Sequence, residues 1–174
     1  MAAATVVITE SNGISGSQVD TVGISNINFG SVDSPNLLPT GRMIIIGQNS
    51  YTKYERIHVT NFGTNNNLYN FYFWKSAGAL KSNESLFSNI FGVDGATFRI
   101  INYETPSQVS DASVADVPTS LPTNTARIPF TGSQTTILNT TGISNYIRIQ
   151  TRTTESTPTG AGNQKTFTFR YDEN

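Results

Sequence analysis

The stretch YERIHVTNFGTNNNLYNFYFW, residues 54–74, decides the fold class of this chain. Its first seven residues alternate, with Ile57 and Val59 on one face and charged or polar side chains on the other, as in a half-buried strand. Gly63 and the asparagines that follow tolerate the positive φ angles of a turn. The aromatic run 68–74 then reads as a second strand that is apolar on both faces. The stretch therefore predicts antiparallel β-structure.

Short β-branched and aromatic runs, separated by Gly, Pro, Asn and Ser clusters, recur over the whole chain. No stretch has the apolar spacing of an amphipathic helix. We therefore expect an all-β fold, an antiparallel β-sandwich of immunoglobulin-like or jelly-roll-like type with long loops, in a single domain of residues 1–174. The other expected strands are 5–10, 24–32, 42–46, 96–103, 146–152 and 165–171, and residues 84–91 suit either one helical turn or a loop.

The last two expected strands, 146–152 and 165–171, both alternate with a period of two residues. We expect them to pair as a final β-hairpin around the exposed tip 153–164, because consecutive alternating runs usually pair. Alternation then divides their side chains into two faces. The core face would hold Ile147, Ile149, Phe167, Phe169 and Tyr171, and the outward face Arg148, Arg152, Lys165 and Arg170.

A long polar stretch, residues 106–124, contains Pro106, Pro118 and Pro122 and no strand pattern. Loops of that length without secondary structure are usually functional or mobile. This stretch is therefore the candidate for an extended arm.

Composition limits the classes of partner. Only 13% of the residues are charged, against about 25% in ordinary domains. With 11 Lys and Arg against 12 Asp and Glu, the net charge is −1, too weak a field to collect a phosphate backbone or an anionic membrane surface. No run approaches the roughly 20 apolar residues that span a bilayer. We expect neither nucleic acid nor membrane as a partner.

The chain has no cysteine, which excludes disulfides, thiolate metal sites and cysteine nucleophiles. Its first ten residues have no basic region and only a short apolar run, so we expect no signal peptide and synthesis in a cytoplasm.

Chemistry-bearing motifs are missing from the sequence. His58 is the single histidine and falls on the polar face of its expected strand. No serine sits in a Gly-x-Ser-x-Gly motif, the acids are scattered, and no glycine loop has the strand–loop–helix setting that cradles phosphate. We expect no enzyme, no cofactor and no metal, although paired carboxylates contributed by distant strands stay open.

Two kinds of surface could carry binding. The aromatic run 68–74 is either a stacking platform for sugars or bases or a strand buried on both faces, and its end at Trp74 and Lys75 is the part closest to the surface. The arginines of the last two strands either bind acidic partners or guard an edge strand against promiscuous pairing. The interface candidates are Tyr72, Trp74, Lys75, Arg148, Arg152 and Arg170.

Three segments carry a resemblance to a known class of protein: INFGS at 27–31 before a Pro- and Asn-rich turn, NSYTKYER at 49–56 leading into a strand, and TFTFRYDE at 166–173. With them the whole chain resembles the small β-sandwich structural proteins of tailed-bacteriophage virions, which decorate heads or complete necks and tails. A second Asn-Phe-Gly at 61–63 resembles immunoglobulin-like domains, although the Cys and Trp spacing of antibody domains is missing.

The resemblance implies a virion protein that binds other virion proteins, the major capsid protein or neck and tail proteins, and forms a homo-oligomer. We expect a capsid decoration or cement protein on the outside of a phage head. A neck or tail structural component is the first alternative. A carbohydrate-binding module, suggested by Trp74 and the tyrosines near it, is the second.

Overall fold

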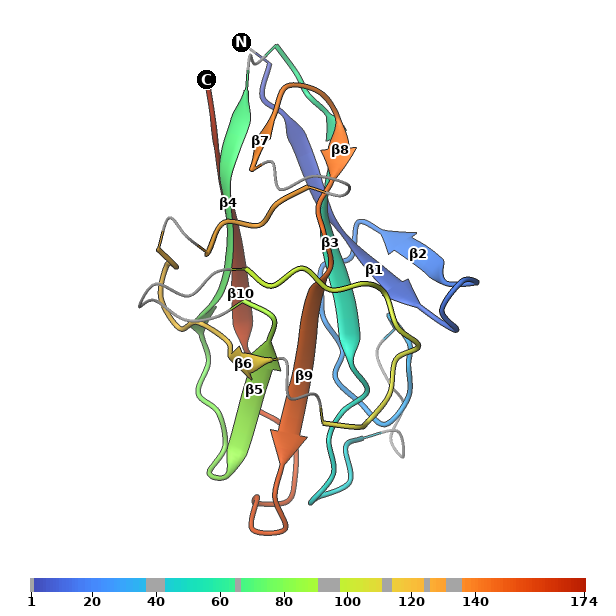
Figure 1. Ribbon diagram of the computed structural model, residues 1–174. Helices are drawn as coiled ribbons and strands as arrows, with labels where there is room; N and C mark the ends of the chain where they lie inside the picture. Colours follow the sequence, from blue (N-terminus) through green and yellow to red (C-terminus); the bar gives the residue numbers. More distant parts are fainter. Residues whose placement is uncertain are drawn as a thin grey trace.

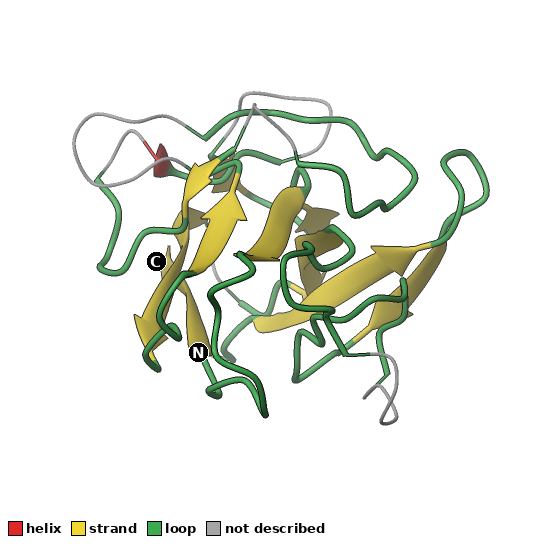
Figure 2. Ribbon diagram, turned by 90° about the horizontal axis from the view of Figure 1, so that it is seen from below, coloured by secondary structure: helices red, strands yellow, loops and turns green. Residues whose placement is uncertain are grey.

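A computed structural model describes residues 2–36, 43–64, 67–90, 98–110, 114–123, 126–130 and 136–174. It confirms the all-β class: two antiparallel sheets pack against each other as a sandwich (Figure 1). Strands and their connecting loops make up nearly all of the described chain (Figure 2). The strands are β1 (Thr5–Asn12), β2 (Val19–Val22), β3 (Lys53–Asn61), β4 (Leu68–Ala77), β5 (Glu84–Ser88), β6 (Ala115–Asp116), β7 (Ile137–Leu138), β8 (Gly142–Ile143), β9 (Ile147–Thr153) and β10 (Thr166–Glu173).

The two sheets differ greatly in width. The larger has the strand order β2-β1-β3-β9-β5-β6, with β8 also paired to β3, and the smaller has the order β10-β4-β7. In the described part of the chain, β10 is therefore an edge strand whose one partner is β4. No described segment forms a helix of the length and apolar character needed to cross a bilayer.

Alternation in β3 sets the inner face of the larger sheet. Ile57 and Val59 are buried, as predicted, and belong to the main hydrophobic core. In the antiparallel register Ile8 lies opposite Ile57 and Val6 opposite Val59, so the apolar side chains of β1 share this face. Burial of this combined face holds the two sheets together.

Strand β4 supplies the centre of the core through Phe71 and Phe73, both fully buried. Phe73 stacks on Phe167 of β10 with ring centroids 5.3 Å apart. Phe71 stacks on Tyr171 with centroids 5.8 Å apart. Such pairs add about 0.5–1.5 kcal/mol each beyond the area that they bury, so β4 and β10 are joined by rings as well as by backbone hydrogen bonds.

A bulge in β4 interrupts the regular alternation of the strand. Asn70 has φ of 56°, and the register between β4 and β10 shifts between Arg170 and Asp172. The extra residue reverses the alternation on its N-terminal side. Leu68 therefore joins the core and Tyr69 does not, the opposite of what a regular strand predicts.

The prediction that the last two strands pair as a hairpin is wrong. Strand β9 pairs with β3 and β5 in the larger sheet, whereas β10 pairs with β4 in the smaller one. The connection between them is long enough to cross from one sheet to the other. The predicted core residues are correct, because Ile147 and Ile149 are buried and the aromatic side chains of β10 pack against the same core from the opposite side. Lys165, expected on the outward face, is a correction: its side chain is only 8% exposed and its ammonium contacts Glu84 at 2.7 Å, because alternation puts residue 165 on the same side as Phe167.

Other expected elements also need correction. Residues 84–88 form strand β5 rather than a helical turn or loop. The second strand is β2, and residues 24–32 form no strand, because Gly23, with φ of 78°, turns the chain out of the sheet. Residues 43–46 are not a strand either, and Arg42 lies outside the described residues. Of the expected strand 96–103, residues 96 and 97 lie outside the described residues. Residues 98–103 form no strand, and Phe98 makes an isolated bridge with Ile90.

The described part of the proline-containing stretch 106–124 lies against the sandwich. Val117 is 5% exposed, and its amide donates to the Leu86 carbonyl at 2.9 Å. The Lys75 amide donates to the Pro118 carbonyl at 2.8 Å. In the isolated chain these residues cover the sandwich and do not project from it.

Candidate interaction surface

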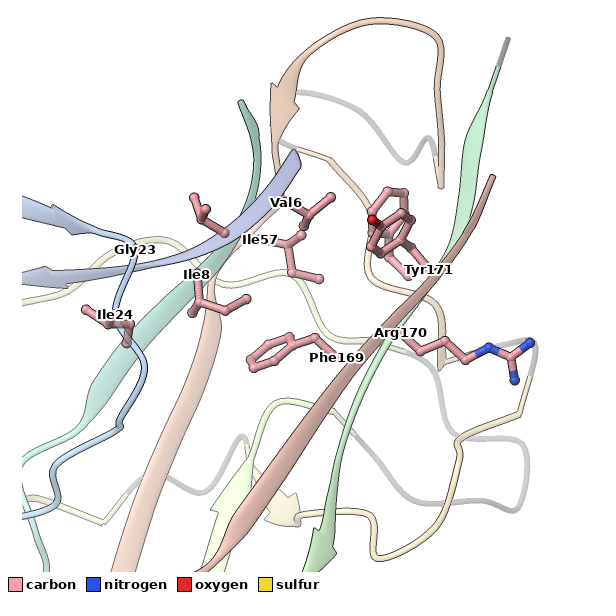
Figure 3. Close-up of a pocket in the computed structure, with 10 residues that line it drawn as sticks. Val6, Ile8, Gly23, Ile24, Ile57, Phe169, Arg170 and Tyr171 are labelled. Carbon is pink, nitrogen blue, oxygen red and sulfur yellow. The ribbon is translucent and has the colours of Figure 1, made fainter. Parts of the chain in front are cut away.

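An apolar cavity of about 320 Å³ opens between β1 of the larger sheet and β10 of the smaller one. Figure 3 shows Phe169 directed toward Ile8 and Ile57, whereas Arg170 points away from the cavity. Val6 and Tyr171 close the same space at its other end. The cavity exists because the larger sheet continues beyond the edge of the smaller one, so that inner-face side chains of β1 lack a full partner layer.

A second hollow of about 660 Å³ continues this space along β10. Residues 24–29 and 162–167 form its walls, and the ring of Phe29 lies 6.3 Å from that of Phe167. We call the two hollows together the β10 groove. Its apolar lining comes from Val6, Ile8, Ile24, Phe167, Phe169 and Tyr171, and polar residues, among them Asn26, Asn28 and Gln164, complete the lining of the second hollow.

The outer face of β10 carries one charge of each sign. The guanidinium of Arg170 contacts the Asp172 carboxylate at 3.1 Å, with the two side chains 48% and 29% exposed. Asn70 donates to the second carboxylate oxygen of Asp172 at 2.7 Å. This hydrogen bond, with a smaller contribution from Arg170, holds the pKa of Asp172 below its usual value. Asp172 is therefore an anion at neutral pH.

The six predicted interface residues do not form one surface. Tyr72 lies opposite Arg170 in the β-sheet register, but it is only 4% exposed. Trp74 and Lys75 are half-buried, and the Lys75 ammonium donates to the Gly78 carbonyl at 2.6 Å. Arg170 is the well-exposed member of this group.

Arg148 and Arg152 lie on the outer face of the larger sheet, on the far side of the sandwich from Arg170. The Arg148 guanidinium lies over the Tyr54 ring at 5.5 Å and contacts Glu104 at 3.3 Å. That of Arg152 lies over the Phe87 ring at 4.1 Å. Each is held by an aromatic face, which favours a packing role for these two arginines.

A charged cluster that the sequence analysis missed lies inside the sandwich. Glu10, Lys53 and Glu55 are all fully buried. The Lys53 ammonium donates to Glu10 at 2.7 Å and to the Ser34 carbonyl at 2.5 Å. Glu10 lies opposite Glu55 in the register between β1 and β3. The signal was available, because Lys53 and Glu55 continue the inward-facing positions of Ile57 and Val59.

Burial, and next the negative charge of Glu10, raise the pKa of Glu55 well above its ordinary value of 4.5, against the opposing effect of Lys53. His58 takes no part in this cluster, because alternation places it on the outer face of β3, whereas Glu55 is on the inner face. Within the described ranges, no three or more His, Asp or Glu side chains gather so as to hold a metal ion.

The raised pKa of Glu55 predicts a pH dependence of stability. The folded chain binds the Glu55 proton more tightly than the unfolded chain does. The contribution of Glu55 to the free energy of unfolding is therefore largest below pH 4.5, and it falls as the pH rises toward the raised pKa. The Glu55→Gln variant keeps a neutral side chain and should lose this slope. Urea unfolding midpoints of the two proteins, measured between about pH 5 and about pH 9, give the change of stability with pH. If stability falls equally with pH in the wild type and in the variant, Glu55 is not its cause.

Comparisons with known proteins give no relative: the sequence matches no family model, and neither curated proteins nor solved structures match it.

Proposed function

We propose that this chain is a structural protein of a virion, a decoration protein that binds the outside of a bacteriophage head through protein–protein contacts. The observation that supports this proposal best is the β10 groove beside the edge of β10 to which no described strand pairs. An uncovered strand edge offers backbone hydrogen bonds to another chain, and an apolar groove next to it receives alternate side chains. Such a surface suits a polypeptide partner.

The rest of the surface is consistent with many weak, neutral contacts. Large apolar side chains are exposed near the β1–β2 turn, where Ile14 is 70%, Val19 68% and Val22 55% exposed. A decoration protein repeats the same contacts at symmetric positions on a shell, so each contact need supply little energy. The low content of charged residues avoids the cost of removing ions from water.

A neck or tail component stays the first alternative, since it would use the same chemistry. A carbohydrate-binding role gains no support from the fold: Trp74 is half-buried and does not line the β10 groove.

Immunogold microscopy of virus particles purified from the source culture, with antibodies against the purified chain, tests the proposal. We expect gold on the heads, and many copies of the chain per particle by quantitative mass spectrometry. Gold confined to necks or tails selects the alternative. Particles that lack the chain contradict both.

A further inference from the structure

Strand β10 has the features of an edge that accepts another strand. In the described chain its one strand partner is β4, and residues 24–29, which run beside it, are not a strand. Free edges are normally shielded by prolines, bulges toward solvent or a covering loop, because unpaired backbone groups recruit other chains. The register between β4 and β10 is irregular at two places, and at both the extra residue is on β4, near Asn70 and at Ser76, so neither disrupts the outer edge of β10.

The two charges on the outer face of β10 are self-complementary. Arg170 and Asp172 lie on the same face, two residues apart. If two copies of β10 pair antiparallel about a two-fold axis through Tyr171, Arg170 of each copy lies opposite Asp172 of the other. A two-fold axis through Arg170 instead places two arginines opposite each other, which is unfavourable. Charge therefore selects one register.

We propose that β10 pairs with β10 of a second copy in this register, giving a symmetric dimer in which each copy adds its three-stranded sheet to one continuous sheet. In an antiparallel pair the inward side chains of both strands lie on one face. Phe169 and Tyr171 of the second copy would thus extend the apolar layer at the mouth of the β10 groove, where Val6 and Ile8 lack a full partner layer. This inference uses the same edge of β10 that supports the proposed function, but it assigns that edge to a second copy and does not depend on a virion role.

A charge exchange tests the register. Arg170→Asp puts two acids on the outer face of β10, and Asp172→Arg puts two arginines there, so each variant opposes like charges when it pairs with itself. In analytical ultracentrifugation we expect the wild type to have twice the 18.9 kDa mass of one chain. The dissociation constant of the dimer should be at least tenfold higher for each variant than for the wild type. An equimolar mixture of the two variants should recover the dimer, because opposite charges then face each other.

Arg99→Asp is the matched control, since it makes the same charge change at an exposed arginine outside β10, and it should dimerise like the wild type. Circular dichroism checks that each variant is folded. If Asp172→Arg does not fold, the dimer dissociation constants of Arg170→Asp and Arg99→Asp still test the proposal. A monomeric wild type overturns the proposal, as do single variants that dimerise normally or a mixture that stays monomeric. Immunogold labelling of particles is independent of all these results, so the two proposals fail separately.

Discussion

Replacing Lys53 by methionine is expected to lower the free energy of unfolding by about 3–5 kcal/mol at neutral pH, the usual cost of removing one partner from a buried ion pair. Lys53 is the ammonium that balances Glu10 at 2.7 Å inside the sandwich, where water cannot solvate the carboxylate. Methionine fills a similar volume, so the loss reflects the uncompensated charge and not a cavity. Urea unfolding of the two proteins measures the difference.

Lys81→Met is the control for this prediction. Its ammonium donates to the carbonyls of Pro158, Thr159 and Gly160 near the surface, where water can replace it, so we expect a loss of about 1 kcal/mol or less. Equal losses in the two variants would show that the buried cluster has no special weight in stability.

The second large effect is expected for Phe73→Ala, which should cost about 3–5 kcal/mol. Phe73 is fully buried and contacts two rings of β10, Phe167 at 5.3 Å and Phe169 at 4.8 Å between centroids. Alanine leaves a cavity between the sheets that these rings cannot fill without leaving β10. Thermal and urea unfolding give the loss of stability.

Phe87→Ala serves as the comparison for Phe73. Phe87 is half-buried on the outer face of β5, under the Arg152 guanidinium, so its removal creates no internal cavity. We expect a cost clearly smaller than for Phe73. A Phe73→Ala variant as stable as Phe87→Ala would mean that the β4–β10 rings do not form the core described here.

Alternation identified most of the fold from the sequence. It predicted β1, β3, β4, β9 and β10 and the core positions of Ile57, Val59, Ile147 and Ile149. It could not choose partners, because a period of two residues tells which face a side chain takes but not which strand lies beside it. For this reason β9 and β10 were expected to pair and instead lie in different sheets. Strand β5 was missed because Ser85 and Ser88 weaken its apolar pattern.

The candidate surface was less predictable than the fold. The exposure of Arg170 was predicted, since an alternating strand must expose one of its faces. The β10 groove depends on which strand becomes the edge and on how far the larger sheet extends past it, and both follow from pairing over long sequence separations. Tyr72 is buried, in line with a strand buried on both faces, one of the two alternatives for 68–74. Its cover comes from residues distant in sequence, including Arg127, whose Nε lies 3.5 Å from the Tyr72 hydroxyl.

Hydrogen exchange of the backbone amides, measured peptide by peptide at low and at high protein concentration, tests most directly whether the free edge of the smaller sheet is where this protein binds. Pairing predicts that amides in residues 166–173 exchange more slowly at high concentration, while those of β5 and β9 do not change. Protection that appears over β9 near Arg148 and Arg152, with β10 unchanged, would contradict it.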